Sequence, residues 1–175
     1  LALNAVWNVL NEFTLSAIPL FIIMGEILLE SGVSQKIYSS LSGIFRHIPG
    51  GLLHTNIAVC TVFGAISGSS LSTAAAVGSV AYPELSKRNY NEPMVVGSLA
   101  GGGTLGLLIP PSLSLLIYGA LTETSIGKLF MGGILPGILM AILFMLYIYI
   151  RCIKNPKLWN SIYQKKLSKG LNLNF

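Results

Sequence analysis

Long apolar runs, separated by short polar turns, follow one another along most of the chain. The first, from Phe13 to Leu29, contains a single charged residue, Glu26. A run of about 17 residues is near the minimum for crossing a bilayer, so we expect a transmembrane helix here. Glu26 lies near the end of this helix, where its carboxylate can reach the interface. A role for it as an ion ligand or proton relay is the less favoured alternative.

A different pattern follows from Val33 to His47, where apolar and polar residues alternate with helical spacing. The apolar positions recur at steps of three and four: Val33, Ile37, Leu41, Ile44 and Phe45. This pattern is typical of an amphipathic helix, and we expect an arm that lies in the membrane interface. Pro49, Gly50 and Gly51 then end the arm and redirect the chain.

The next apolar run begins at Gly51 and meets no Asp, Glu, Lys or Arg until Glu84. Its first part, up to Ile66, is about 24 Å long as a helix, shorter than the hydrocarbon core of about 30 Å. Ser67 to Thr73 follows, where every residue except Leu71 is glycine, serine or threonine. We therefore expect a re-entrant hairpin over residues 51–84 with its tip at Ser67–Thr73.

Two further apolar runs complete the pattern. Residues 93–121 are interrupted by Gly101–Thr104 and by Pro110–Ser112, which predicts a discontinuous helix with a glycine-rich turn. Residues 129–150 carry no charge and predict an ordinary transmembrane helix. The expected fold class is an all-α integral membrane protein: one repeat with transmembrane helices, an interfacial arm helix, a re-entrant hairpin and a discontinuous helix.

Composition and charge agree with a membrane protein. The chain is 53% hydrophobic and 10% charged, against about 25% charged residues in soluble domains. Placing the hairpin base and a basic tail over residues 151–175 in the cytoplasm leaves only Lys128 of the 11 basic residues outside. The positive charge is thus explained by topology and lipid contact, and we expect no nucleic-acid partner. We divide the chain into a scaffold-type part (1–48), a transport-type part (49–150) and the tail.

The two interruptions are the candidate site. Non-helical backbone at membrane depth persists only where protein buries it or where it lines a wet cavity, and paired broken helices point to a transporter site. Helix N-termini favour an anion, while carbonyls and hydroxyls favour a hard cation. The expected sodium ligands are Ser67, Gly68, Ser69, Ser70, Gly103, Thr104 and Gly106. The expected substrate-binding residues are Ser69, Ser70, Thr73, Pro110, Pro111 and Ser112.

Close helix packing is the alternative explanation of these small residues. No Ser/His/Asp set, metal-ligand spacing or phosphate loop occurs, so we expect neither enzymatic activity nor a cofactor beyond sodium as a coupling ion.

At these positions the chain resembles the large membrane subunit of tripartite ATP-independent periplasmic (TRAP) transporters. The family's hairpin-tip motif falls on Ser67–Thr73 and its broken-helix motif on Gly102–Ser112. The resemblance also rests on these segments: Ile18–Gly25, Pro49–Gly51, Phe63–Ser70, Thr73–Ala76, Ile109–Ser112 and Gly132–Gly137.

The resemblance implies sodium-coupled import of small organic carboxylates, C4-dicarboxylates among them, across the bacterial inner membrane by an elevator mechanism. It also implies two protein partners: a periplasmic solute-binding protein and a small membrane subunit. Family members carry a second, inverted repeat, and nothing after Arg151 is apolar enough to supply one. Because the chain also begins at Leu1 without Met, we expect a first-repeat fragment. Alternative functions are another hairpin-containing divalent-anion/sodium symporter, an ion channel and a non-transporting membrane scaffold.

Overall fold

The computed structural model describes residues 13–45 and 47–155, with side chains from Ala17 onward. Within these ranges every regular element is a helix, which confirms the all-α prediction. The helices are α2 (Phe13–Glu30), α3 (Val33–Phe45), α4 (Leu52–Ser67), α5 (Ser70–Lys87), α6 (Glu92–Leu108), α7 (Leu113–Leu121) and α8 (Ile126–Lys154). Most of the expected basic tail, from residue 156 onward, lies outside the described residues.

Helices α2 and α3 form a bent pair. Gly32, with a φ of 69°, occupies the turn between them, and the helix axes differ by 62°. A positive φ is the left-handed region that glycine enters without steric cost. By length and composition the pair fits one broken membrane span, so the interfacial position of α3 stays a prediction.

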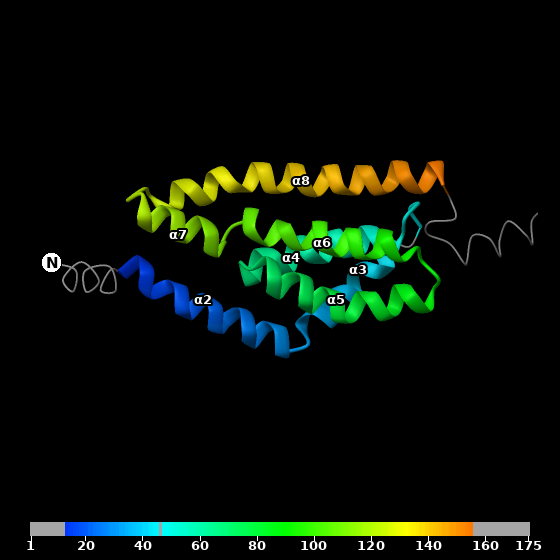
Figure 1. Ribbon diagram of the computed structural model, residues 1–175, viewed down its shortest axis with the longest axis horizontal. Coiled ribbons are helices and arrows are strands. Elements are labelled where there is room, and N and C mark those ends of the chain that lie inside the picture. The colour runs from blue at the N-terminus through cyan, green and yellow to red at the C-terminus, as the bar shows by residue number, and fades with distance from the viewer. Residues whose placement is uncertain (1–12, 46, 156–175) are drawn as a thin grey trace, which may run out of the picture.

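Helices α4 and α5 form a hairpin whose two open ends lie at the same end of the molecule (Figure 1). Helix α4 ends at Gly68, which has a φ of 63°, and α5 begins directly after Ser69. Helix α6 continues through the glycine cluster to Leu108. The expectation of a glycine-rich turn at Gly101–Thr104 is therefore wrong, and the break lies between Leu108 and Leu113.

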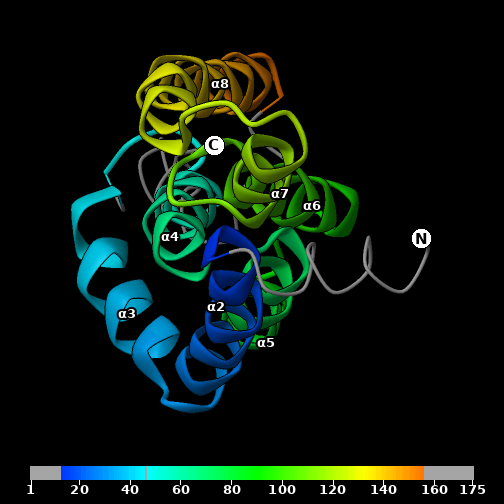
Figure 2. The same cartoon turned by 90° about the vertical axis from the view of Figure 1, so that its left-hand side faces the viewer.

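Helix α4 is the centre of the molecule. Figure 2 looks along the long axis and shows α4 between α3 and α6, with α8 on one side and α5 on the other. Its fully buried large side chains include Leu53, Thr55, Asn56, Ile57, Val59, Cys60 and Phe63. The Asn56 amide donates to Ser98 Oγ of α6 at 2.9 Å, a polar link inside this apolar core.

The outer side of the bundle is apolar. Helix α8 exposes large hydrophobic side chains along its length, such as Met131 (74%), Leu135 (78%) and Leu139 (55%). By length and apolar composition, α8 and the pair α6–α7 (Glu92–Leu121) are each able to cross a membrane. An apolar surface of this length is suited to lipid or to other membrane helices.

Candidate functional site

The hairpin tip is built by two helix ends. Gly68 closes α4 by donating its amide N–H to the Gly64 carbonyl at 2.8 Å. Ser69 then caps α5, because its Oγ accepts the Ser72 amide N–H at 3.4 Å. A left-handed glycine and a serine N-cap are common helix-end signals, and here they follow each other directly. The tip consequently presents the carbonyl end of α4 beside the amide end of α5.

A buried hydroxyl network holds this tip together. Thr73 Oγ1 donates to the Ser69 carbonyl oxygen at 2.6 Å and lies 2.8 Å from Ser67 Oγ. The Thr73 amide N–H donates to the same Ser69 carbonyl at 3.1 Å. Ser67 and Thr73 are 2% and 0% exposed. Because the Thr73 hydroxyl proton is donated to the Ser69 carbonyl, the Ser67 hydroxyl is the donor between Ser67 Oγ and Thr73 Oγ1. Both hydroxyl oxygens keep lone pairs that can accept from, or coordinate, another group.

The second break also leaves oxygen atoms without helical donors. Pro110 and Pro111 have no N–H, so the carbonyls of Gly106 and Leu107, four residues earlier, lack their usual i+4 partners. Ser114 Oγ donates to the Leu107 carbonyl at 3.0 Å. Ser112 caps α7 by accepting the Leu115 amide N–H at 3.3 Å. This break therefore repeats the arrangement of the tip, with a carbonyl end beside an amide end.

The two breaks touch each other. The Leu113 amide N–H, at the start of α7, donates to the Gly68 carbonyl at 3.1 Å. A Cβ on Gly68 would lie 2.8 Å from the Pro111 carbonyl oxygen, so only glycine allows this approach. Figure 1 shows both interruptions between the two loop-bearing ends of the molecule, nearer the end with the α7–α8 loop. Four helix ends, two carbonyl ends and two amide ends, thus converge on one region.

Glycines of α6 bring this helix against the hairpin. A Cβ on Gly106 would lie 2.9 Å from the Ser69 carbonyl oxygen and 3.0 Å from Thr73 Oγ1. A Cβ on Gly103 would lie 2.9 Å from Ala74 Cβ and 3.3 Å from the Ser70 carbonyl oxygen. In helical α6 the missing side chains at these two positions allow this close packing.

The predicted site residues separate into two groups. Around the contact between the breaks lie Ser67, Gly68, Ser69, Ser70, Thr73, Gly103, Gly106, Pro111 and Ser112. Thr104 is exposed, and its hydroxyl donates to the Gly101 carbonyl of its own helix at 2.7 Å. Pro110 Cγ lies 3.3 Å from the Cβ position of Gly133, so Pro110 packs against α8.

The predicted ligand residues did not include three residues that also lie at or beside the breaks. Ser72 and Ser114 supply hydrogen bonds to the tip and to the end of α6. Gly25 of α2 is buried, and its Cβ position lies 3.6 Å from the Ser67 carbonyl oxygen. The Pro-Pro pair carried a signal for Ser114, because carbonyls deprived of i+4 donors need another partner. Nothing in the sequence pattern joined Gly25 to the hairpin.

The ligands available at the two breaks are uncharged oxygens. Within the described ranges, no group of three or more His, Cys, Asp or Glu side chains is arranged to hold a metal ion. Hydroxyl and carbonyl oxygens suit hard cations, whereas helix amide ends suit anions. The arrangement can accordingly hold a cation and an anion side by side.

Comparison with known proteins identifies relatives of one kind. A family model described as "Tripartite ATP-independent periplasmic transporter, DctM component" matches residues 1–166. The C4-dicarboxylate TRAP transporter large permease protein of Pseudomonas aeruginosa is 41% identical over 140 residues, covering 80% of this chain and 33% of the relative. The ectoine/5-hydroxyectoine permease of Ruegeria pomeroyi is 37% identical over 142 residues, covering 81% and 33%.

A third relative is named for another solute. The sialic acid TRAP transporter large permease protein of Vibrio cholerae is 34% identical over 145 residues, covering 83% of this chain and 34% of the relative. The chain spans about a third of the length of these curated relatives.

Proposed function

The chain belongs to the DctM family of tripartite ATP-independent periplasmic transporters, and we propose that it forms one sodium- and solute-binding repeat of a carboxylate importer. The observation that carries this proposal is the contact between the two breaks through the Gly68 carbonyl and the Leu113 amide N–H. Discontinuous helices whose ends meet in mid-molecule are the usual architecture of secondary-transporter binding sites.

The proposed sodium ligands are the oxygens gathered at the tip. Ser67 Oγ, Thr73 Oγ1 and the Ser69 carbonyl lie within hydrogen-bonding distance of one another, beside Gly106. The Gly106 carbonyl, which faces no i+4 N–H, adds a candidate from the second break. Of the original set, Thr104 has the weakest support because its hydroxyl turns back onto α6.

The proposed solute-binding groups are the amide ends of α5 and α7. Ser69 and Ser112 cap these helices, and Ser70 opens α5. Two positive helix ends near one another favour an anionic group such as a carboxylate. A co-bound sodium would add attraction without any charged side chain at the breaks.

We further propose the assembly that the family implies. The permease would work in the bacterial inner membrane with a periplasmic solute-binding protein and a small membrane subunit, by elevator-like movement of the hairpin region. The names of the relatives include C4-dicarboxylate, ectoine and sialic acid, so the proposal extends only to a carboxylate-bearing class.

A structural role for the same residues is supported by the close glycine contacts of α6 with α4 and α5. In that case the hydroxyls would only hold the helices together. The two functions differ in one measurable respect, since a sodium site makes solute uptake depend on the tip hydroxyls in a sodium-dependent manner.

The test uses a chimera, because this chain spans a third of its relatives. The matching segment of the Pseudomonas aeruginosa permease is replaced by this chain's sequence, and C4-dicarboxylate uptake is measured in proteoliposomes with that system's own partners. The variants are Ser67→Ala and Thr73→Val. The control is Ser79→Ala, because within the described part of the chain the Ser79 hydroxyl bonds only to the Ala76 carbonyl of its own helix.

We expect each tip variant to raise the sodium concentration for half-maximal uptake by about three- to tenfold, the worth of one polar contact. Saturating sodium should restore uptake, because coupling between ion and solute is reciprocal. Unchanged sodium dependence in both well-folded variants would show that the tip hydroxyls only pack the helices together and do not bind sodium. A folded chimera without uptake at any sodium concentration would contradict the transport function itself.

A further inference from the structure

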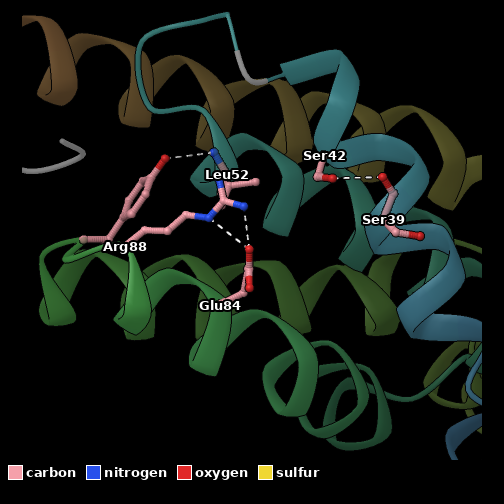
Figure 3. Close-up of polar contacts among 6 residues, drawn as sticks. Ser39, Ser42, Leu52, Glu84 and Arg88 are labelled. Atoms are coloured by element: carbon pink, nitrogen blue, oxygen red, sulfur yellow. Dashed lines mark hydrogen bonds and ion pairs between the residues drawn. The ribbon is translucent and has the colours of Figure 1, made fainter. Parts of the chain in front are cut away.

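A half-open cavity of about 570 Å³, lined by both polar and apolar side chains, lies away from the two breaks, between α3 and the second half of α5. We call it the arm pocket. Its polar lining includes Tyr38, Ser39, Ser42, Glu84, Lys87 and Arg88. Figure 3 shows Ser39 and Ser42 on α3, and Glu84 and Arg88 at the end of α5. Lys87 is 17 residues beyond Ser70 on α5, about 25 Å along the helix, so this pocket is separate from the candidate transport site.

One polar atom in this lining has no partner. The Tyr38 side chain is 4% exposed, and its hydroxyl forms no hydrogen bond within the described part of the chain. A buried hydroxyl without a partner costs about 1–3 kcal/mol, so native structures rarely retain one without a ligand or water. Tyr38 lines the pocket, but its hydroxyl oxygen is shielded from solvent, so a ligand in the pocket reaches this oxygen after a small shift of the ring.

The charges of the pocket favour an anion. Glu84 and Arg88 form an ion pair in which Arg88 Nε and Nη2 both donate to Glu84 Oε1, at 2.9 and 2.5 Å. Lys87 forms no salt bridge within residues 13–45 and 47–155. Two cations therefore face one carboxylate. Because the guanidinium has five N–H donors and Glu84 uses two of them, Arg88 retains donors for a second oxyanion.

The opposite wall provides hydrogen-bond acceptors. Ser39 Oγ donates to the Lys36 carbonyl at 2.9 Å, and Ser42 Oγ donates to the Ser39 carbonyl at 2.8 Å. With their protons used on their own helix, both oxygens have lone pairs for hydroxyl groups of a ligand. A fitting ligand thus combines an oxyanion at the α5 side with hydroxyls at the α3 side.

We propose that the arm pocket binds the phosphate of a hydroxyl-bearing phosphate ester. Lys87 and Arg88 contact the phosphate oxygens, and Ser39 and Ser42 accept from the ligand's hydroxyls. Tyr38 donates its hydroxyl to the ester once its ring has shifted toward the pocket. A glycerol phosphate group has this chemistry, either as the head group of phosphatidylglycerol or as soluble glycerol phosphate. Bound there, the ligand would bridge the arm helix and the hairpin.

The test compares the purified 175-residue chain and three variants by native mass spectrometry in a neutral detergent. The probes are phosphatidylglycerol, phosphatidylcholine and glycerol phosphate. Lys87→Gln removes the unpaired cation, and Tyr38→Phe removes the partnerless hydroxyl while keeping the ring. Lys36→Gln is the matched control, because Lys36 is an exposed cation of α3 that does not line the pocket. Thermal unfolding of each variant checks that it is folded.

We expect phosphatidylglycerol to bind better than phosphatidylcholine, and Lys87→Gln and Tyr38→Phe each to lower its affinity about three- to tenfold. Lys36→Gln should leave the affinity unchanged. Competition by glycerol phosphate, lost in the same two variants, would assign the site to a soluble ester, and its absence would assign the site to lipid. Equal affinity in all variants overturns the proposal. So does a loss in Lys87→Gln alone, or an equal loss in Lys36→Gln, because either result describes general attraction to basic residues.

Discussion

At Gly106, both ion binding at the hairpin tip and helix packing require a residue without a side chain. A Cβ at this position would lie 2.9 Å from the Ser69 carbonyl oxygen and 3.0 Å from Thr73 Oγ1, so a side chain there would displace the oxygens of the hairpin tip. The neighbour to be displaced is backbone, which cannot rotate away as a flexible side chain can. The position therefore tolerates glycine alone, whichever function the tip has.

We expect Gly106→Ala to lower the free energy of unfolding by about 1–3 kcal/mol, the usual cost of forcing an extra methyl group into a packed site. Gly97 is the control, because it lies on the same helix with no atom within 4 Å of its Cβ position. Gly97→Ala should stabilise α6 by about 0.5–1 kcal/mol. Thermal and denaturant unfolding in detergent measure both. Equal effects of the two substitutions would show that α6 does not press on the tip.

At the scale of elements, the second break depends on capping more than on its glycines. Helix α6 tolerates Gly101, Gly102 and Gly103 in its interior and ends only where Pro110 and Pro111 remove two N–H donors. Helix α7 then needs a cap of its own, and Ser112 supplies it while 1% exposed. The start of α7 is consequently held by two contacts, the Ser112 cap and the hydrogen bond from the Leu113 amide N–H to the Gly68 carbonyl.

Ser112→Ala should lower the free energy of unfolding by about 1 kcal/mol, because it removes the N-cap of α7. Ser125 occupies the corresponding position before α8, yet its side chain makes no capping hydrogen bond. Ser125→Ala should therefore have almost no effect. Amide hydrogen exchange provides a local readout, and we expect faster exchange at Leu115 in Ser112→Ala. Unchanged exchange there would contradict the capping role.

At the scale of the whole molecule, the loops between helices lie at two opposite ends. The loop after α5 and the end of α8 lie at one end, and the loop from α7 to α8 lies at the other (Figure 1). The basic residues Lys87, Arg88, Arg151 and Lys154 belong to the first end, and Lys128 belongs to the second. This division matches the charge asymmetry that orients membrane proteins, and it leads to a topological prediction.

Cysteines introduced at Arg88 and Lys154 should react with an impermeant thiol reagent only from the cytoplasm, and one at Glu123 only from outside. The native Cys60 and Cys152 are buried free thiols and are first replaced by alanine. Labelling of right-side-out and inverted vesicles measures the two accessibilities. A cysteine at position 123 that reacts from the same side as one at position 88 would exclude the hairpin topology.

Much of the fold was predictable because its signals are local. Gly68 and Ser69 are helix-end residues, and they stand where α4 ends and α5 begins. The prediction of a turn at the glycine cluster Gly101–Thr104 was wrong for a physical reason. Glycine weakens an isolated helix by about 1 kcal/mol per residue, but close packing of α6 against Cys60, Ala74 and the hairpin tip compensates for this loss. Local propensity contains no information about such a partner.

The sequence by itself determined the all-α membrane class, the segments that become helices and the two places where apolar runs are interrupted. These follow from hydropathy, run length and end signals, which act within a few residues of each other. Only the tertiary structure decided that the two interruptions meet through Gly68 and Leu113, that Gly25 joins the tip, and that α3 and α5 enclose the arm pocket. Contacts between segments far apart in the chain depend on how helices pack in three dimensions, and no local pattern of residues specifies that packing.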